Sequence, residues 1–387
     1  MTNATSIISD RTFDGERALY GLSHATLERV RFAGHADGES ALKECADITV
    51  SDATFELRYP LWHTTDVELT NALFTESCRA ALWYASDVRI RYAKLLGIKA
   101  MRECDNVSID ASEIRSEEFG WSSRDVAVRD SSVEGEYAFL HARDLYLEDV
   151  RFRGKYSFQY VENLTIEGGT FDTKDAFWHA RNVTVRDATL KGEYLGWYSE
   201  GLTLVNCRIE GTQPLVYCRD LTLVDCEMVG CDLAFEGSDV QVTIRGHVDS
   251  IRDPRSGRIE AGSVGEVVHD TLAGCGAQIV AGTKGEMGAH TPCTRIAIPV
   301  SRARRSHSHA KPTGCAVFRI RNKPVHCHKM EVRIERLGED SYATKGDRRR
   351  RASALRRQKE AARGRRPGAG CKHRCGASCL LRQNTGR

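Results

Sequence analysis

Charged and aromatic residues occur together in one short stretch of the chain, at a spacing that could support sugar chemistry. TKDAFWHA, residues 173–180, holds a lysine, an aspartate, a tryptophan and a histidine within eight positions. Carboxylate, amine and imidazole groups transfer protons, and an indole ring offers a large apolar face with a polar edge. Two carboxylates flanking a glycosidic bond would suit glycoside hydrolysis. The stretch predicts either a carbohydrate site or one course of a repeating wall in which no residue is special.

The same residue types return every nineteen residues from 105 to 218, and each repeat is called a rung below. All five tryptophans of the chain fall in one column when the rungs upstream of residue 105, which follow the pattern with small slips, are included. Glu136 and Lys155, and likewise Lys174 and Glu193, are expected to be neighbours in adjacent rungs, and Asp175 with His179 is a further acid–base pair. The candidate catalytic residues are Glu136, Lys155, Lys174, Asp175, His179 and Glu193. The candidate substrate-binding residues are Trp121, Tyr137, Tyr156, Trp178, Tyr194 and Trp197.

A purely structural interpretation explains the same columns. Opposite charges one rung apart satisfy each other across a parallel sheet, and solenoids pack by stacking like residues on like. If Trp178 points inward, strand alternation places Asp175 and His179 outside; if it points outward, Asp175 is inside and needs a partner. The sequence leaves both open: a charged and aromatic groove, or ladders that only stabilise the molecule.

Apolar columns identify the elements that position these residues. One of them is Val107, Val126, Leu145, Leu164, Val183, Leu202 and Leu221. Short alternating stretches rich in β-branched residues, bounded by Asn, Asp and Gly, predict strands. Three strands in nineteen residues leave only short turns, so the chain must coil and stack each rung on the last at ~4.8 Å. We predict an all-β fold, a right-handed parallel β-helix of about eleven rungs, with the candidate site along its third strand.

Two further columns mark the corners of the coil. The column before the first strand contains Asn106, Asp125, Asp144, Asn163, Asn182, Gly201 and Asp220. Asn and Asp tolerate left-handed backbone and bond nearby backbone groups, so this column is interpreted as a turn ladder rather than a metal site. A small-residue column marks the other corner: Ser116, Gly135, Gly154, Thr173, Gly192, Gly211 and Gly230.

The charge of the chain divides it into two unlike parts. The 387 residues carry a net charge of +3, but residues 282–387 hold 27 Lys and Arg against 7 Asp and Glu, a net of +20. The preceding part holds 29 basic and 46 acidic residues, a net of −17. We expect an N-terminal cap (1–24), β-helix rungs (25–240), the C-terminal end of the β-helix (241–281) and an irregular or disordered basic tail (282–387).

Three interpretations of the basic tail remain. Its arginine-rich run at 346–368 could bind polyanions non-specifically. Cys371, Cys375 and Cys379 could belong to a zinc module, although the usual C-x2-C spacing is absent. The favoured interpretation is a stretch translated out of frame or a fusion scar, with the β-helix ending near residue 281.

Location and cofactors follow from what the sequence lacks. The N-terminus has neither the basic nor the apolar region of a secretory signal, and no apolar run reaches the ~18 residues of a membrane span. The eight cysteines before residue 282 do not form a secreted framework, so reduced, packed thiols in a cytoplasmic protein are expected. Dinucleotide, P-loop and zinc-protease motifs are missing, and we predict no metal and no cofactor.

Several longer motifs resemble a known family. They are FDGERALYGL, GESALKE, RYPLWH, RAALWYA, TKDAFWHARNVTV, GEYLGWYSEGLTLVNC, GTQPLVYC and DLAFEGSDV. Together they resemble an uncharacterised bacterial domain-of-unknown-function family with a pectin-lyase-like, single-stranded right-handed β-helix, over about residues 11–281. The resemblance implies the fold, and no activity carries over from it.

The functional prediction is a carbohydrate-binding or carbohydrate-active β-helix with an oligosaccharide partner. If the protein is an enzyme, it is a lyase or hydrolase of polysaccharides or oligosaccharides. Fold-level analogy alone connects β-helices with polysaccharides, so the alternative of a non-catalytic scaffold is kept.

Overall fold

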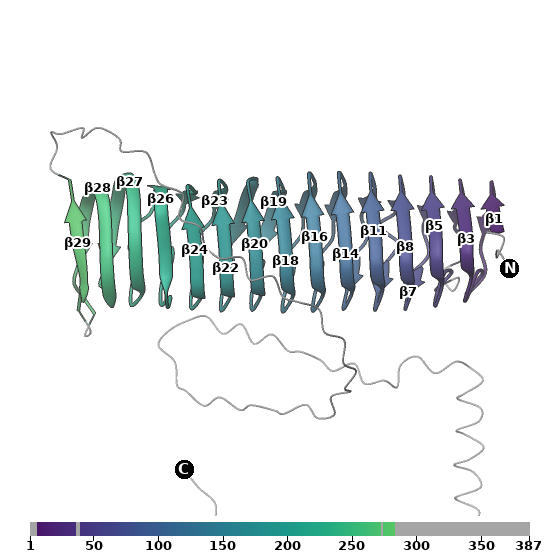
Figure 1. Ribbon diagram of the computed structural model, residues 1–387, viewed down its shortest axis with the longest axis horizontal. Coiled ribbons are helices and arrows are strands. Elements are labelled where there is room, and N and C mark those ends of the chain that lie inside the picture. The colour runs from purple at the N-terminus through teal and green to yellow at the C-terminus, as the bar shows by residue number, and fades with distance from the viewer. Residues whose placement is uncertain (1–5, 36–38, 272–273, 283–387) are drawn as a thin grey trace, which may run out of the picture. The chain divides into compact units, whose positions relative to one another are not determined.

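The chain winds into a parallel β-solenoid. The structure, a computed structural model, describes residues 6–35, 39–271 and 274–282. These residues contain strands and turns but no helix, and the predicted parallel β-helix is confirmed (Figure 1). It has about fourteen rungs rather than eleven, because strands before residue 25 and after residue 240 stack on it as well.

The first face is the longest parallel sheet. Its column of apolar residues is in register as expected, since Val126 pairs with Leu145 and Leu145 with Leu164. Its strands are β1 (Ser6–Ser9), β3 (Ser23–Glu28), β5 (Ala46–Ser51), β8 (Thr65–Thr70), β11 (Ser86–Arg91), β14 (Asp105–Asp110), β16 (Arg124–Arg129), β18 (Arg143–Glu148), β20 (Glu162–Glu167), β22 (Arg181–Arg186), β24 (Glu200–Val205), β26 (Leu221–Val229), β27 (Asp239–Arg252), β28 (Ser256–Val268) and β29 (Ala277–Ala281).

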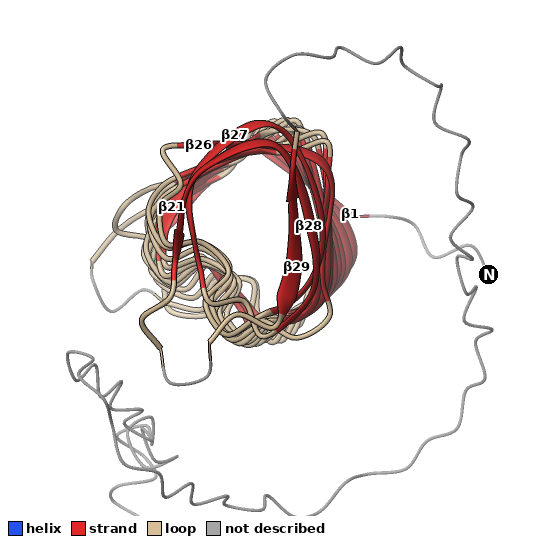
Figure 2. Ribbon diagram, turned by 90° about the vertical axis from the view of Figure 1, so that its left-hand side faces the viewer, coloured by secondary structure: helices blue, strands red, loops and turns tan. Residues whose placement is uncertain are grey.

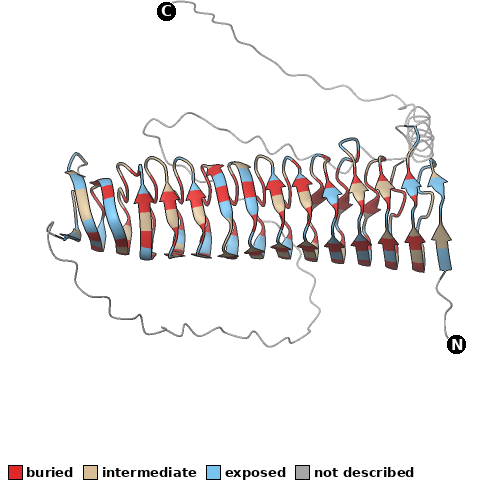
Figure 3. Cartoon of the chain, turned by 90° about the horizontal axis from the view of Figure 1, so that it is seen from above, coloured by how far each residue is buried: buried red, intermediate tan, exposed pale blue. Residues whose placement is uncertain are grey.

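The second face consists of shorter strands that complete the apolar interior. Phe32, Phe55 and Phe74 are fully buried and stack at centroid distances of 5.0 and 4.5 Å, and buried and exposed bands alternate along the solenoid (Figure 3). The strands are β2 (Thr12–Phe13), β4 (Arg31–Phe32), β6 (Thr54–Phe55), β9 (Leu73–Phe74), β12 (Lys94–Leu95), β15 (Glu113–Arg115), β17 (Ser132–Glu134), β19 (Arg151–Lys155), β21 (Thr170–Lys174), β23 (Thr189–Lys191) and β25 (Arg208–Glu210). The second half of β26 pairs with β25 and continues this face.

The third face differs from the prediction of a third strand. Only β7 (Leu61–Trp62), β10 (Leu82–Trp83) and β13 (Met101–Arg102) form a regular sheet there. Elsewhere the chain runs through turns, which gather along one side of the coil when the solenoid is viewed along its axis (Figure 2). Backbone hydrogen bonds still join the rungs, for example Tyr156 N to Lys174 O at 2.8 Å and Phe158 N to Ala138 O at 2.9 Å.

Left-handed backbone conformations explain why the third face is not a strand. Asp175, Phe177 and His179 have φ angles of 56°, 60° and 54°. Every second residue therefore lies outside the β region, and side chains no longer alternate between two faces. Ala176 and Phe177 are both fully buried although they are adjacent.

The two predicted corners are present. Asp125, Asp144 and Asn163 have φ angles of 53°, 56° and 57°, and Asn163 Nδ2 donates to Asp144 Oδ1 at 2.8 Å. At the other corner a Cβ on Gly154 would lie 2.1 Å from the carbonyl oxygen of Gly135 in the preceding rung. Backbone approach at this corner therefore requires small residues.

The C-terminal rungs are held by a buried carboxylate. Asp253 is 1% exposed and accepts hydrogen bonds from the Thr271 amide and hydroxyl and from the Asp270 amide, at 2.7 to 3.1 Å. His269 Nδ1 lies 2.9 Å from its other oxygen. Burial raises the pKa of Asp253, but these hydrogen bonds outweigh it and lower that pKa to about 2.

Other sequence expectations concern cysteines and the ends of the chain. The cysteines of the described residues are free thiols, and all but Cys275 are buried. The described residues include no apolar helix of membrane-spanning length. The tail from residue 283 onward, with its candidate zinc ligands, lies outside the described residues.

Candidate functional site

Charged residues line the corner where the second face passes into the third. Lys155 Nζ lies 3.1 Å from Glu136 Oε1, and Lys174 Nζ lies 2.8 Å from Glu193 Oε2, so the expected neighbours meet. The two lysines pair with each other in register between β19 and β21. All four side chains are more than a third exposed, and exposed ion pairs of this kind contribute little to stability.

Asp175 differs from these exposed charges. It is 5% exposed, and its carboxylate forms no hydrogen bond or ion pair with any residue that the structure describes. Burial raises the pKa of Asp175 to about 6; the Lys174 ammonium opposes this rise and the Glu193 carboxylate adds to it. A carboxyl group with this pKa is only partly ionised slightly below neutral pH, which suits general acid–base chemistry.

Asp175 interrupts a column of tyrosines. Tyr137 and Tyr156 stack with their ring centroids 4.9 Å apart, and Tyr194 resumes the column one rung beyond Asp175. The Lys174 ammonium lies 5.1 Å from the centroid of the Tyr194 ring. A small ionisable group thus stands where the repeat would place an aromatic ring.

The tryptophans stand next to this column and are half-buried. Trp121 donates its indole N–H to the carbonyl oxygen of Tyr137, Trp178 donates to that of Tyr194, and Trp197 to that of Gln213, at 2.5 to 2.8 Å. The rings of Trp178 and Trp197 stack at 5.5 Å and 6°. Their facing surfaces cover each other, so a sugar would meet ring edges there rather than the open faces that the sequence analysis assumed.

The predicted acid–base pair of Asp175 and His179 is not formed. No hydrogen bond or ion pair joins them in the part of the chain that the structure describes. Left-handed backbone at Asp175, Phe177 and His179 leaves Asp175 buried in the wall and His179 exposed. The His179 ring stacks instead between Tyr160 and Tyr198, each 5.0 Å away.

His179 belongs to an exposed aromatic ladder from which the sequence analysis selected only this residue. The ladder consists of His141, Tyr160, His179, Tyr198 and Tyr217, stacked at 4.9 to 5.1 Å. Burial and the neighbouring Arg181 lower the pKa of His179, which favours its neutral form. In the sequence, the signal for this ladder is an unbroken column of His and Tyr residues at nineteen-residue spacing.

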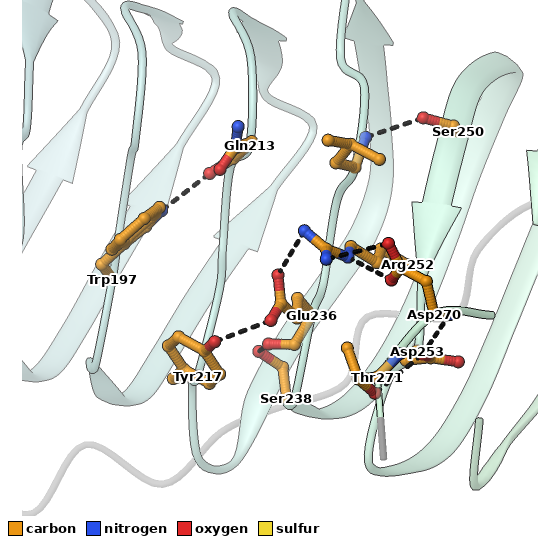
Figure 4. Close-up of polar contacts among 11 residues, drawn as sticks. Trp197, Gln213, Tyr217, Glu236, Ser238, Ser250, Arg252, Asp253, Asp270 and Thr271 are labelled. Atoms are coloured by element: carbon orange, nitrogen blue, oxygen red, sulfur yellow. Dashed lines mark hydrogen bonds and ion pairs between the residues drawn. The ribbon is translucent and has the colours of Figure 1, made fainter. Parts of the chain in front are cut away.

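The ladder ends at Tyr217 in a polar network. The Tyr217 hydroxyl donates to Glu236 Oε1 at 2.7 Å, and Arg252 Nη1 lies 3.2 Å from Glu236 Oε2 (Figure 4). Burial and this hydrogen bond raise the pKa of Tyr217 to about 12. A hollow of about 420 Å³ opens beside this end of the ladder and is lined by His179, Tyr198, Ser199, Glu200, Tyr217 and the arginines 181, 219 and 255.

Comparison with known proteins gives a family but no activity. A family model described as "Protein of unknown function (DUF3737)" matches residues 6–279. None of the curated proteins matches the chain.

Among solved structures, the A-module of the Azotobacter vinelandii mannuronan C-5 epimerase AlgE6 is 14% identical, with a TM-score of 0.30 over 68% of this chain and 91% of that one. PfbA, a surface adhesin of Streptococcus pneumoniae, is 10% identical, with a TM-score of 0.23 over 71% and 80% of the two chains. The periplasmic alginate epimerase AlgG is 9% identical, with a TM-score of 0.22 over 71% and 77%.

Proposed function

This chain belongs to the DUF3737 family of proteins of unknown function, and we propose that it is a carbohydrate-binding β-helix whose site surrounds Asp175 on the third face. The observation that supports this most is the interrupted tyrosine column. The Asp175 carboxylate has no hydrogen-bond or ion-pair partner among the described residues, and residues with strongly shifted pKa values concentrate at functional sites.

The groups around Asp175 suit a sugar. A carboxylate accepts hydrogen bonds from hydroxyl groups, and the nearby half-buried Trp178 and Tyr194 combine apolar rings with polar edges. Lys174 and Glu193 bring a further donor and acceptor at the exposed margin, 2.8 Å from each other. A polyhydroxylated ligand would satisfy Asp175, which the protein itself leaves without a partner.

The same arrangement supplies proton transfer. A carboxyl group with a pKa of about 6 can deliver a proton to a leaving oxygen near neutral pH. Glu193, in the next rung, is a second carboxylate that interacts with it electrostatically. In a carbohydrate-active enzyme of the lyase or hydrolase class, Asp175 would be the acid.

The alternative function is a non-catalytic scaffold. The charged and indole groups of the third face that have partners within the protein favour it. Lys155 and Glu136 pair, and the Trp178 and Trp197 indoles find carbonyl acceptors. These contacts stabilise the coil whether or not a ligand binds. Asp175 is the position where the two functions predict different results.

Substitution of Asp175 by Asn tests the proposal. Asn keeps the size of the side chain and tolerates the left-handed backbone. We expect the full chain to bind oligosaccharides from a defined panel in calorimetry, and Asp175→Asn to lose affinity by about tenfold or more without losing stability. Asp172→Asn is the matched control, since Asp172 is exposed on β21 of the second face.

Three outcomes distinguish the two functions. Loss of binding in Asp175→Asn but not in Asp172→Asn supports the site. If both variants still bind the sugar, Asp175 is not part of the binding site. If the wild-type chain binds no sugar of the panel, neutral or acidic, the proposed function is contradicted and the non-catalytic scaffold is favoured.

A further inference from the structure

The hollow beside the aromatic ladder begins in the same rung as Asp175. His179 follows Asp175 by four residues and lines the hollow together with Tyr198 and Tyr217. Its volume of about 420 Å³ lies in the range of small-molecule sites.

An alternating charge column ends in the hollow at an arginine that forms no ion pair within the described residues. Arg181 lies 3.6 Å from Glu162 and 3.9 Å from Glu200, so this one base interacts with the acids of both neighbouring rungs. Arg219 follows Glu200 in the column. Its guanidinium forms no ion pair with any residue that the structure describes.

The acid nearest to continuing the column is already occupied. Asp239 accepts from Arg255 Nε at 2.7 Å and from the Ser256 hydroxyl at 2.6 Å. Arg255 thereby holds this carboxylate in a direct ion pair, whereas Arg219 interacts with it only electrostatically. The hollow is left with an exposed guanidinium, whose planar set of donors matches a carboxylate.

The aromatic ladder contributes ring edges to the same place. Each ring face is covered by the next ring, and the far face of Tyr217 packs on Gly237, where a Cβ would lie 2.7 Å from the ring. Tyr198 is nevertheless 46% exposed. Its edge and that of His179 line the hollow, and a neutral imidazole can donate to or accept from a sugar hydroxyl.

We infer that this hollow binds the carboxylate of a short sugar acid, with Arg219 as the anion-binding residue and the His179 and Tyr198 edges contacting the ring. The inference rests on the proposed function and names the class of sugar. The ligand is short because residues 1–281 carry a net charge of −17, which disfavours approach of a long polyanion.

Calorimetry with matched acidic and neutral sugars tests the inference on the full chain. The probes are di- and trisaccharides of galacturonate, glucuronate and mannuronate, and their neutral galactose, glucose and mannose counterparts. At least one acidic probe is expected to bind more tightly than its neutral counterpart. Arg219→Gln should weaken that acidic probe by about tenfold and leave the neutral one unchanged.

Arg153→Gln is the matched control, because it removes one exposed positive charge from β19 on the second face. It should change neither affinity by more than about twofold, as expected for a distant exposed charge under salt screening. Equal losses in both variants would show a general charge effect and overturn the site. Competition by inorganic phosphate at the same concentration as the sugar acid would overturn the choice of a sugar.

Failure of the inference can be told apart from failure of the proposed function. If acidic and neutral probes bind equally and Arg219→Gln alters neither, the anion site is wrong and sugar binding at Asp175 stands. If no probe of either kind binds the wild-type chain, both are wrong.

Discussion

Asp175 is the residue whose substitution is expected to affect ligand binding and folding stability in opposite directions. The repeat places tyrosines in the rungs on either side of it; Asp175 is a buried residue whose carboxylate has no hydrogen-bond or ion-pair partner among the described residues. Its raised pKa means that the folded protein binds a proton that the unfolded chain has already released at the same pH. Folding stability must therefore depend on pH through this one group.

We predict that stability falls as the pH rises from about 4 to about 6 through Asp175. The folded pKa of about 6 lies above the ordinary value of 3.8, so in this window the native state holds more protons than the unfolded state. The slope of the unfolding free energy against pH is then negative for this group. Urea unfolding of the wild type and of Asp175→Asn across this range measures it.

The Asn variant should show a flatter profile in that window and be at least as stable as the wild type at pH 7. Asp172→Asn should keep the wild-type profile, because Asp172 is exposed. An Asp175→Asn protein that is markedly less stable at pH 7 would mean that the carboxylate has a structural partner, against the geometry.

The candidate site was only partly predictable from residue types. Spacing alone placed Glu136 beside Lys155 and Lys174 beside Glu193, because in-register stacking converts nineteen residues into one rung. Whether Asp175 or Trp178 faces inward could not be decided, since the argument assumed strand alternation. The pairing of Asp175 with His179 failed for the same reason.

At the scale of elements, the third face shows what the sequence pattern missed. The three left-handed columns contain residues such as Tyr137, Phe139 and His141, and no Val, Ile or Thr has a positive φ in the described part of the chain. β-Branched residues are disfavoured there. Their absence from alternate columns was a signal for turns, whereas the V-x-V columns of the first face correctly predicted strands.

Substitution of two glycines measures how tightly the Tyr217 ring packs on the backbone at the end of the aromatic ladder. Gly237 and Gly230 both have φ angles of 61°, but a Cβ on Gly237 would lie 2.7 Å from the Tyr217 ring whereas Gly230 has open space. Gly230→Ala should lose only the ~1 kcal/mol of left-handed strain. Gly237→Ala should lose a further 1–3 kcal/mol, roughly, from overpacking against the ring.

Urea midpoints of the two variants give this difference directly. Equal midpoints would show that Tyr217 moves freely, and then the end of the ladder is not a fixed wall of the hollow. A larger loss in Gly237→Ala would show that the ladder is rigid where the sugar acid is proposed to bind.

The C-terminal rungs depend on Asp253. Its folded pKa of about 2 lies below the ordinary 3.8, so it contributes stability above about pH 4 that is lost as the pH falls toward 2. Asp253→Asn should cost about 2–4 kcal/mol near neutral pH, because an amide cannot accept all of the bonds from Thr271 and Asp270. The variant should also lose part of the acid dependence between pH 4 and pH 2.

Thermal unfolding of Asp253→Asn against Asp249→Asn checks this role. Asp249 is exposed and lies 3.7 Å from His247 Nε2, so its loss should be nearly neutral. Equal stabilities of the two variants would contradict an anchoring role for Asp253.

At the scale of the whole molecule, each rung contacts only its neighbours. Stability is then close to a sum of rung and interface terms, and removal of material beyond the last rung should have little effect. The apolar core extends to Ala261, with Ala277 and Ile279 of β29 packed against it. No core residue of the described chain lies beyond β29.

A chain ending at residue 281 should therefore melt within about 2 °C of the full chain, since 1 kcal/mol corresponds to roughly 2–4 °C in a domain of this size. Residues 282–387 contribute a net charge of +20, and every residue of the described core precedes them. A chain ending at residue 255, which lacks β28 and β29 and exposes the long edge of β27, should melt well below both. If the chain ending at 281 melted as low as the one ending at 255, the basic segment would be a structural part of the solenoid. The assignment of the last rung to β29 would then be wrong.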